Sequence, residues 1–289
     1  MPPEPSPRRE QPSTYFVQDR NNKIERERVT LQDQMFTQEM GGVLPEQPDP
    51  TRFSRILDVG CGTGNWLVEA AQTYPTMTTL VGIDISARMV EYARAVAKEQ
   101  GVSDRVEFHV MDVLRKIEFP LQYFDLVNHR MSWGYLRTWD WPNVVQEYRR
   151  VTRSGGVIRI SETTAFGESN GIAINKLREI GREAFFNAGH LFEKRGDGLT
   201  SKLVGILHQQ GLQNVQTRKV LMDQGTGSAM EKSAKENTRL AFRNMLPFMQ
   251  KWTKVPEDYE QLYQQAMKEL DQPDYTAVWE MVTVWGTNP

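Results

Sequence analysis

Short apolar stretches and segments of helical periodicity alternate along residues 55–161. The apolar stretches predict five strands, at residues 55–59, 80–84, 106–111, 124–128 and 157–161. Between them, apolar residues recur at helical spacing, as in Trp66, Leu67, Ala70 and Ala71, which is typical of a helix that buries one face. This alternation with short connections predicts an α/β fold, with a doubly wound, mostly parallel sheet covered by helices on both faces.

Further elements flank this alternating region. Apolar residues at helical spacing, among them Ile24, Leu31 and Phe36, predict an N-terminal helix that ends at Gly41-Gly42. Beyond residue 162 the pattern predicts helices at residues 172–188, 201–210, 241–252 and 258–270, and strands at residues 214–222 and 275–285. The last strand is apolar on both faces, which suits an interior position in the sheet.

These patterns divide the chain into five predicted parts. They are a disordered tail rich in Pro, Arg and Glu (1–12), an N-terminal helical arm or cap (13–50), an α/β core (51–162), an inserted helical lid (163–200), and the remainder of the sheet with further lid helices (201–289). The length of 289 residues fits one core domain with such a cap.

Composition narrows the environment and the partners. The net charge of −2 gives no reason to expect binding to nucleic acid. Cys61 is the single cysteine, so no intrachain disulfide can form. The chain has neither an apolar signal core at its start nor an apolar run of about 20 residues. We therefore expect a cytoplasmic protein that has no membrane partner.

A glycine-rich turn follows the first predicted strand, in the segment Asp58-Val59-Gly60-Cys61-Gly62-Thr63-Gly64. The dinucleotide fingerprint Gly-x-Gly-x-x-Gly would need a glycine at position 65, where this chain has Asn65. The carboxylate of Asp58 would also repel a pyrophosphate, whereas it would attract the ammonium and sulfonium groups of S-adenosylmethionine (SAM). The turn therefore favours SAM over NAD(P), although Asp58 could instead only cap the turn.

Two more carboxylates end successive predicted strands. Asp84 ends the second strand and could accept hydrogen bonds from both ribose hydroxyls of a nucleoside. Asp112 follows the third strand and could accept a hydrogen bond from an adenine amino group, or it could serve only as a turn or helix-capping residue. With Asp58, these side chains are expected at the sheet edge where open α/β folds bind ligands.

The segments 56–64, 81–86 and 124–127, together with Asp112 and residues 147–156, resemble the motifs of class I SAM-dependent methyltransferases, with Ser154 where a proline often stands. This resemblance implies a Rossmann-like, seven-stranded sheet whose last strand is antiparallel. Residues 26–42 resemble the helix that precedes this domain in small-molecule and regulator-type members. The N-terminal region also resembles bacterial natural-product C-methyltransferases of the teleocidin-pathway type.

The resemblance also implies roles for individual residues toward SAM. Gly60, Gly62 and Gly64 would line the methionine part, and Asp84 would hold the ribose. Adenine would contact four residues, Ile85, Met89, Asp112 and Val113. Asn128, just past the fourth strand, would lie near the methyl donor. No metal site is expected.

Candidate catalytic and substrate-binding residues follow the later strands. His129 and Glu162 are candidate bases, although a lone histidine is often structural and Glu162 could instead bind an arginine such as Arg130. The candidates for contact with the methyl acceptor are Tyr15, Trp133, Tyr135, Phe166 and His190. Aromatic side chains at such a pocket favour a small, largely apolar or aromatic metabolite, with C-methylation in natural-product biosynthesis among the options. These aromatic residues could equally serve ordinary packing.

Several other functions stay open from sequence. A protein or RNA methyltransferase, or a regulator-type methyltransferase, could carry the same cofactor motif, and an NAD(P)-dependent oxidoreductase is less favoured by the turn. The amphipathic N-terminal arm could dock on a second subunit and form a homo-oligomer.

Overall fold

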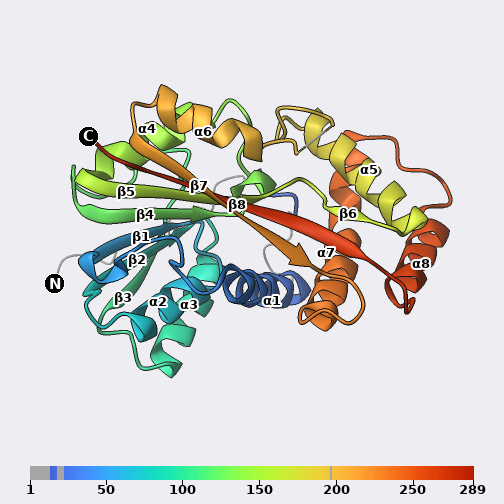
Figure 1. Ribbon diagram of the computed structural model, residues 1–289, viewed down its shortest axis with the longest axis horizontal. Helices are drawn as coiled ribbons and strands as arrows, with labels where there is room; N and C mark the ends of the chain where they lie inside the picture. The colour runs from blue at the N-terminus through green and yellow to red at the C-terminus, as the bar shows by residue number, and fades with distance from the viewer. Residues whose placement is uncertain (1–13, 18–22, 196) are drawn as a thin grey trace, which may run out of the picture.

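One mixed sheet organises the molecule. The computed structural model describes residues 14–17, 23–195 and 197–289 (Figure 1). In this part of the chain the sheet has eight strands in the order β3-β2-β1-β4-β5-β8-β6, and β7 pairs with β8. The strands are β1 (Arg55–Val59), β2 (Thr79–Asp84), β3 (Val106–Val110), β4 (Phe124–Arg130), β5 (Thr152–Thr163), β6 (Glu168–Ser169), β7 (Gln213–Asp223) and β8 (Ala277–Thr287).

The predicted sheet type is confirmed, with one correction. Strands β1 to β5 run parallel, and β8 pairs antiparallel with both β5 and β7, so the last strand does occupy an interior position. The sheet contains eight strands where seven were predicted, because the two-residue strand β6 also pairs with β8. So short a strand has no hydrophobic period of its own, and it pairs with residues 277 and 278 of β8, beyond the point where the pairing of β8 with β5 ends.

Strand β5 is much longer than predicted, and β4 also extends further. β4 continues to Arg130, and β5 begins at Thr152, so that Gly155 and Gly156 lie inside a strand. The sequence pattern placed those glycines before the strand, which was predicted to begin at residue 157. Gly155 adopts a φ of +72°, and the register between β4 and β5 shifts there. The N–H of Gly155 donates to the carbonyl of Asn288 at 2.9 Å. The glycines therefore form a bulge, which a distant residue completes.

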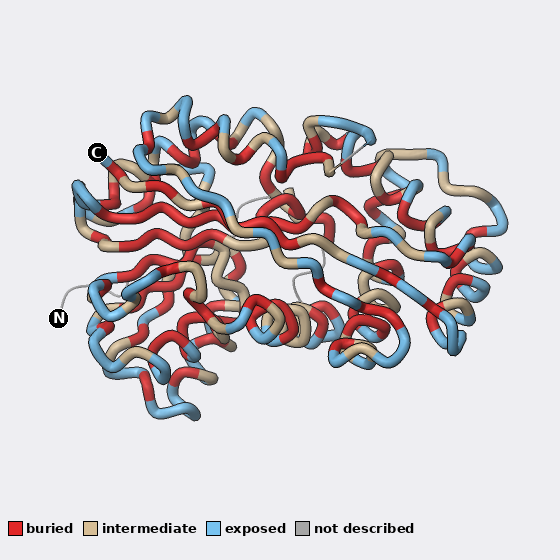
Figure 2. The backbone as a smooth tube through the Cα atoms, in the orientation of Figure 1, coloured by how far each residue is buried: buried red, intermediate tan, exposed pale blue. Residues whose placement is uncertain are grey.

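Helices cover both faces of the sheet. α2 (Asn65–Thr73) and α3 (Ala87–Glu99) pack on one face, whereas α4 (Trp141–Val151) and α6 (Thr200–Gln209) pack on the other. The two faces follow from alternation within single strands. In β1, Ile56 belongs to the core beneath α2 and α3, whereas Leu57 belongs to the core beneath α4 and α6. Burial is highest in the strands between these layers (Figure 2).

The remaining helices gather beyond the carboxyl ends of the parallel strands (Figure 1). They are α1 (Lys23–Met40), α5 (Ile172–Asn187), α7 (Glu231–Trp252) and α8 (Tyr259–Leu270); the short turns are η1 (Pro50–Arg52) and η2 (Ser132–Gly134). α5 packs against α7 and α8, and α1 packs against α7. None of the helices in the described ranges is long and apolar enough to cross a membrane. The predicted tail at residues 1–12 lies outside those ranges.

A row of buried polar side chains crosses the centre of the sheet. Asp58, Asn128 and Arg159 are register partners on the adjacent strands β1, β4 and β5. The amide of Asn128 donates to Asp58 Oδ1 at 2.7 Å and accepts from Arg159 Nη1 at 2.6 Å. Arg159 Nε also donates to Glu46 Oε1 at 2.8 Å, and both side chains of this ion pair are fully buried. The row thus links the segment before β1 to the carboxyl edge of the sheet.

Because one partner of a buried ion pair cannot be left alone without a large desolvation cost, we expect Arg159→Met to lower the free energy of unfolding by about 3–5 kcal/mol. The double variant Glu46→Gln with Arg159→Met should recover part of this loss. Arg153→Met, which breaks the more exposed Arg153–Asp125 pair, should cost about 1 kcal/mol or less. Urea unfolding of the four proteins measures all three effects, and equal losses for Arg159→Met and Arg153→Met would contradict the prediction.

Candidate active site

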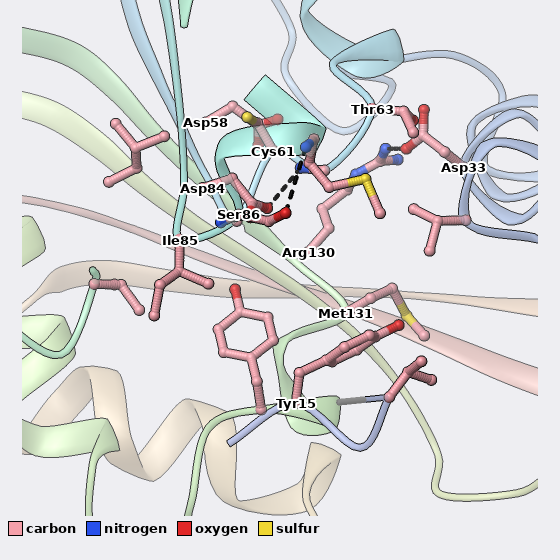
Figure 3. A pocket seen from close by; sticks show the side chains of 18 of the residues that line it. Tyr15, Asp33, Asp58, Cys61, Thr63, Asp84, Ile85, Ser86, Arg130 and Met131 are labelled. Atoms are coloured by element: carbon pink, nitrogen blue, oxygen red, sulfur yellow. Dashed lines mark hydrogen bonds and ion pairs between the residues drawn. The ribbon is translucent and has the colours of Figure 1, made fainter. Parts of the chain in front are cut away.

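A cavity of about 200 Å³ opens where the parallel strands β1, β2 and β4 end. Figure 3 shows Asp58, Cys61 and Asp84 on one side of it, with Tyr15 and Met131 opposite. Its further lining comes from the residues after β3 and from α1. The topology therefore brings segments that lie far apart in the chain to one point, as expected at the carboxyl edge of an open α/β sheet.

The glycine turn shapes the first wall. Gly60 and Gly62 adopt φ values of +64° and +52°, a conformation that side chains with a Cβ rarely take. A Cβ on Gly60 would overlap the hydroxyl of Tyr135. Gly64 has a φ of +76° but faces away from the cavity, where a Cβ would lie 2.7 Å from Ala93 and Phe108. Gly60 and Gly62 thus give a ligand close access to the backbone, whereas Gly64 permits helix packing.

Asp84 holds the turn in place. Its carboxylate accepts the N–H of Gly62 at 3.0 Å and the N–H of Ser86 at 2.8 Å. Both donors are backbone groups, so the carboxylate has a fixed position at the end of β2 (Figure 3). Asp112 also lines the cavity, and it accepts the N–H of Leu114 at 2.9 Å, which is the turn role left open from sequence.

Asp58 is buried at the base of the cavity. Burial raises the pKa of this carboxyl to about 7, against the attraction of Arg130 and the hydrogen bond from Asn128. A carboxyl with such a pKa is partly protonated at neutral pH, and a cation placed beside it would favour its ionised form.

Most of the predicted cofactor residues meet at this cavity. Those that line it are Asp58, Gly60, Gly62, Asp84, Ile85, Met89, Asp112 and Val113. Gly64 and Asn128 do not. Asn128 is fully buried between Asp58 and Arg159, so it orients Asp58 and has no surface on the cavity.

Helix α1 supplies a wall that the sequence analysis missed. Glu25, Val29, Gln32, Asp33 and Phe36 face the cavity at helical spacing. A face that mixes charged and apolar residues has no clear hydrophobic period. The helical spacing of these residues was therefore the only feature of the sequence that could have indicated this wall. The predicted apolar stripe was wrong at one end, because Ile24 is 48 % exposed.

Arg130 pairs with Asp33 of α1 and donates to Thr37 Oγ1 at 3.0 Å, and it makes no contact with Glu162. The suggestion that Glu162 binds Arg130 was therefore wrong. The ion pair instead ties the end of β4 to α1, beside the cavity (Figure 3).

Glu162 holds the turn after β4. Its carboxylate is fully buried and accepts the N–H and the hydroxyl of Ser132, with the N–H of Trp133 at 3.4 Å. Burial raises the pKa of Glu162 to about 7, although these hydrogen bonds oppose the change. Glu162 lines no described cavity, and its contacts make it the anchor of η2.

His129 lies behind Tyr135. Its Nε2 is 2.5 Å from the Tyr135 hydroxyl and its Nδ1 is 2.7 Å from the Tyr148 hydroxyl. Burial lowers the pKa of His129 to about 3, so the ring is neutral, with one nitrogen donating and the other accepting. Tyr135 lines the cavity and His129 does not. Any effect of His129 on a ligand therefore passes through Tyr135.

A second cavity, of about 80 Å³, adjoins the first. Tyr15, Gln32 and Met131 line both, and we call these three residues the junction. Met131 has a φ of +56°, an uncommon conformation for a side chain with a Cβ that here puts the residue between the two spaces. The second cavity lies among η2, α5, α7 and the residues after β5 and β7.

The predicted acceptor residues divide between the two cavities. Tyr15 lines both, Tyr135 lines the first, and Trp133 and Phe166 line the second. His190 lines neither: its Nδ1 is 3.0 Å from the carbonyl oxygens of both Trp133 and Leu136, so it fastens the backbone behind the site. Burial lowers the pKa of His190 to about 4.

Ordinary packing also accounts for part of the aromatic content. The centroid of the Phe185 ring lies 4.7 Å from the centroid of the Trp133 ring and 4.6 Å from that of the Phe248 ring. Phe185 is buried and lines neither cavity. Both readings of the aromatic residues therefore apply, to different members of the set.

Comparisons with known proteins agree with this architecture. Residues 56–156 match the family model described as "Methyltransferase domain". The chain is 30 % identical over 149 residues to 27-O-demethylrifamycin SV methyltransferase of Amycolatopsis mediterranei, covering 51 % of this chain and 52 % of that protein. It is 30 % identical over 129 residues to geranyl diphosphate 2-C-methyltransferase of Saccharopolyspora erythraea, covering 44 % of this chain and 40 % of that protein.

A solved structure extends the likeness to the fold of most of the chain. Phosphoethanolamine N-methyltransferase 2 of Haemonchus contortus, in complex with S-adenosyl-L-methionine, superposes with a TM-score of 0.56 at 15 % identity, covering 94 % of this chain and 60 % of that chain. This likeness shows that most of the chain has the Rossmann-like fold of that methyltransferase. The chain spans about half the length, or less, of the curated relatives named above.

The raised pKa of Glu162 leads to a stability prediction. The carboxyl titrates near 4.3 when unfolded and near 7 when folded, so its contribution to stability is full below pH 4 and is lost as the pH rises through 7. Between pH 5 and pH 8 the wild type should therefore lose more unfolding free energy than Glu162→Gln, by about 1–3 kcal/mol.

Urea unfolding at the two pH values measures this difference. Glu91→Gln, a change at an exposed position of α3, is the control and should behave as the wild type does. An identical loss in the wild type and in Glu162→Gln would show that this carboxyl titrates normally.

Proposed function

We propose that this chain is a SAM-dependent methyltransferase that acts on a small molecule. The observation that carries the proposal is the first cavity, where a glycine turn and three carboxylates, Asp58, Asp84 and Asp112, meet at the edge of a methyltransferase-type sheet. Methyl transfer is a displacement at the sulfonium methyl, for which an enzyme mainly supplies alignment and a dry site.

In this proposal the first cavity holds SAM. Asp84, fixed by two backbone donors, accepts hydrogen bonds from the ribose hydroxyls. Asp112 and Val113 bind the adenine edge, with Ile85 and Met89 against its face. Asp58 attracts the positive charge of the methionine part, where the backbone of Gly60 and Gly62 leaves room. The cofactor supplies an electrophilic methyl group, and the residues orient it.

The second cavity then receives the acceptor, and the junction is where the methyl group passes. Tyr15 is held in the junction by two hydrogen bonds: its hydroxyl donates to Glu25 at 2.5 Å and accepts from Arg28 at 3.0 Å. The adjoining Phe16 donates its N–H to the carbonyl of Gly134 at 3.2 Å. The arm at residues 14–17 thus packs on its own chain, and the proposed oligomer through this arm gains no support from these contacts.

The small volume of the second cavity, about 80 Å³, supports a small acceptor. A protein or RNA substrate could insert only a single side chain or base into it, and the net charge of −2 offers no attraction to a polyanion. The two curated relatives are named for a rifamycin and for geranyl diphosphate, both small metabolites. Natural-product biosynthesis is the setting that these names favour.

The surroundings of the candidate bases support an acceptor that needs no protein base. With a pKa of about 3, His129 is a weak proton acceptor, and both of its nitrogens are bonded to tyrosines. Glu162 is committed to η2. We infer that both act as positioning residues, and that the acceptor is either a carbon nucleophile or an oxygen that arrives already ionised. C-methylation is one reaction of this kind.

Calorimetric titration tests the cofactor assignment. The wild type should bind SAM and should not bind NAD. Asp84→Asn should weaken SAM binding about 10- to 100-fold, because hydrogen bonds to a charged acceptor contribute about 1.5–3 kcal/mol. Glu91→Gln, at an exposed position on the neighbouring helix, should leave the affinity unchanged. Tight binding of NAD without binding of SAM would refute the proposal.

The affinity for SAM should also depend on pH through Asp58. A cation binds the ionised carboxylate, and this carboxyl has a pKa of about 7, so affinity should fall as the pH drops from 8 to 5, by at most about tenfold per unit below pH 7. Asp58→Asn should bind SAM more weakly at pH 8 and should lose this dependence. Titrations at four pH values provide the measurement, and a slope that survives in Asp58→Asn would assign it to another group.

A further inference from the structure

The second cavity contains a buried positive charge that has no counter-ion among the described residues. Arg178 of α5 is 7 % exposed and lines this cavity. Its hydrogen bond to the Asn175 amide oxygen is long, at 3.4 Å, and its other side-chain hydrogen bond goes to Tyr275, which carries no charge at neutral pH. Among the described residues no carboxylate lies within ion-pair distance of Arg178. Arg182, one turn later on α5, donates to the carbonyls of Ala165 and Phe166 and likewise has no acidic partner in the described ranges.

A buried guanidinium in this state is costly, because a charge that is removed from water and left unpaired loses its hydration without compensation. The neighbouring Arg28 does not share the problem. Its Nη2 lies 2.7 Å from Glu25 Oε1, and its Nη1 donates to Asn237 at 3.1 Å. Glu25 is thereby already committed to Arg28, so the wall of the second cavity carries a net positive charge from α5.

Two other residues that line the cavity carry buried hydrogen-bond donors. Gln224 and Trp133 are 5 % and 7 % exposed, and their atoms Nε2 and Nε1 have no hydrogen-bond partner among the described residues. Buried donors are usually satisfied, so two of them on the lining of one small cavity, beside an unpaired cation, favour an acceptor supplied by a ligand. A water molecule could satisfy a donor, but it would leave the guanidinium charge unbalanced.

We propose that the second cavity binds an anionic oxygen group of the methyl acceptor, a carboxylate or a phosphate, with Arg178 as its counter-ion and Gln224 and Trp133 as hydrogen-bond donors. The assignment of this group to the methyl acceptor rests on the proposed methyltransferase function. Arg178 and Gln224 line the second cavity and not the first. The charged end therefore lies away from the cofactor, and the rest of the acceptor extends toward the junction.

This assignment changes the expected acceptor from an apolar molecule to an amphipathic one. Trp133, Phe166 and Phe242 supply apolar walls for its body. The guanidinium supplies orientation, because a planar fork of donors fixes a carboxylate or phosphate in angle as well as in position.

Ligand-observed NMR titration of three small probes tests the proposal. Benzoate and phenyl phosphate carry the two anionic groups, and benzamide is a neutral molecule of the shape of benzoate. With the protein saturated with S-adenosylhomocysteine, at least one anion should bind about tenfold or more tightly than benzamide. The anion that binds better identifies the head group. Equal binding of all three probes would overturn the proposal.

Variants assign the preference to the residues. The preference is the ratio of the affinity for the anion to the affinity for benzamide. Arg178→Gln should bring this ratio close to one, and Arg178→Lys should keep part of the preference. Lys176→Gln, at an exposed position of the same helix, should keep all of it. Gln224→Leu should weaken anion binding several-fold. If Arg178→Gln does not fold, Arg178→Lys and Gln224→Leu carry the comparison. A preference that is unchanged in the Arg178 and Gln224 variants would refute the site.

The same experiment separates the two proposals. Calorimetry of the wild type with S-adenosylhomocysteine comes first, and a failure to bind it would refute the methyltransferase function. Binding of S-adenosylhomocysteine together with no preference for an anion would refute the second-cavity site alone.

Discussion

The polar row through the sheet is the constraint on which the site depends. Asp58, Asn128 and Arg159 are register partners, so pairing of β1, β4 and β5 sets the distances between them. Glu46 closes the row and balances the charge of Arg159. Its other end is Asp58, a carboxyl aimed at the first cavity from within the sheet. A strand pairing in another register would remove this carboxyl from the site and leave charges buried alone.

Burial makes this arrangement responsive to charge. The free protein holds Asp58 with a pKa of about 7, because the surroundings desolvate it. A cationic ligand would replace the lost hydration, so the same burial that disfavours the ionised carboxylate in the empty site strengthens its attraction for such a ligand. The second cavity presents the opposite case, since no carboxylate of the described residues pairs with Arg178 there. Under the proposals above, the cofactor site selects positive charge and the acceptor site selects negative charge.

Residues that line neither cavity fix the positions of the residues that do, and so determine the shape of the space between Asp58 and Arg178. Glu162 fixes η2, His129 and Tyr148 fix Tyr135, and His190 holds the backbone of the same region. None of the three ionisable groups Glu162, His129 and His190 lines a described cavity. A site that orients its reactants and contributes no base is sufficient for methyl transfer to a nucleophile that arrives ready to react.

The sequence by itself determined the features that have a local cause: the alternation of strands and helices, the glycine turn with its positive φ values, and the carboxylates at successive strand ends. Partners were decided only by the tertiary structure. The turn of η2, and not Arg130, satisfies Glu162; Asn288 makes Gly155 part of a bulge; and α1 forms a wall through residues of mixed polarity. Hydrophobic period and motif spacing act within about 20 residues, whereas the identity of a buried partner depends on which distant segments the sheet order brings together.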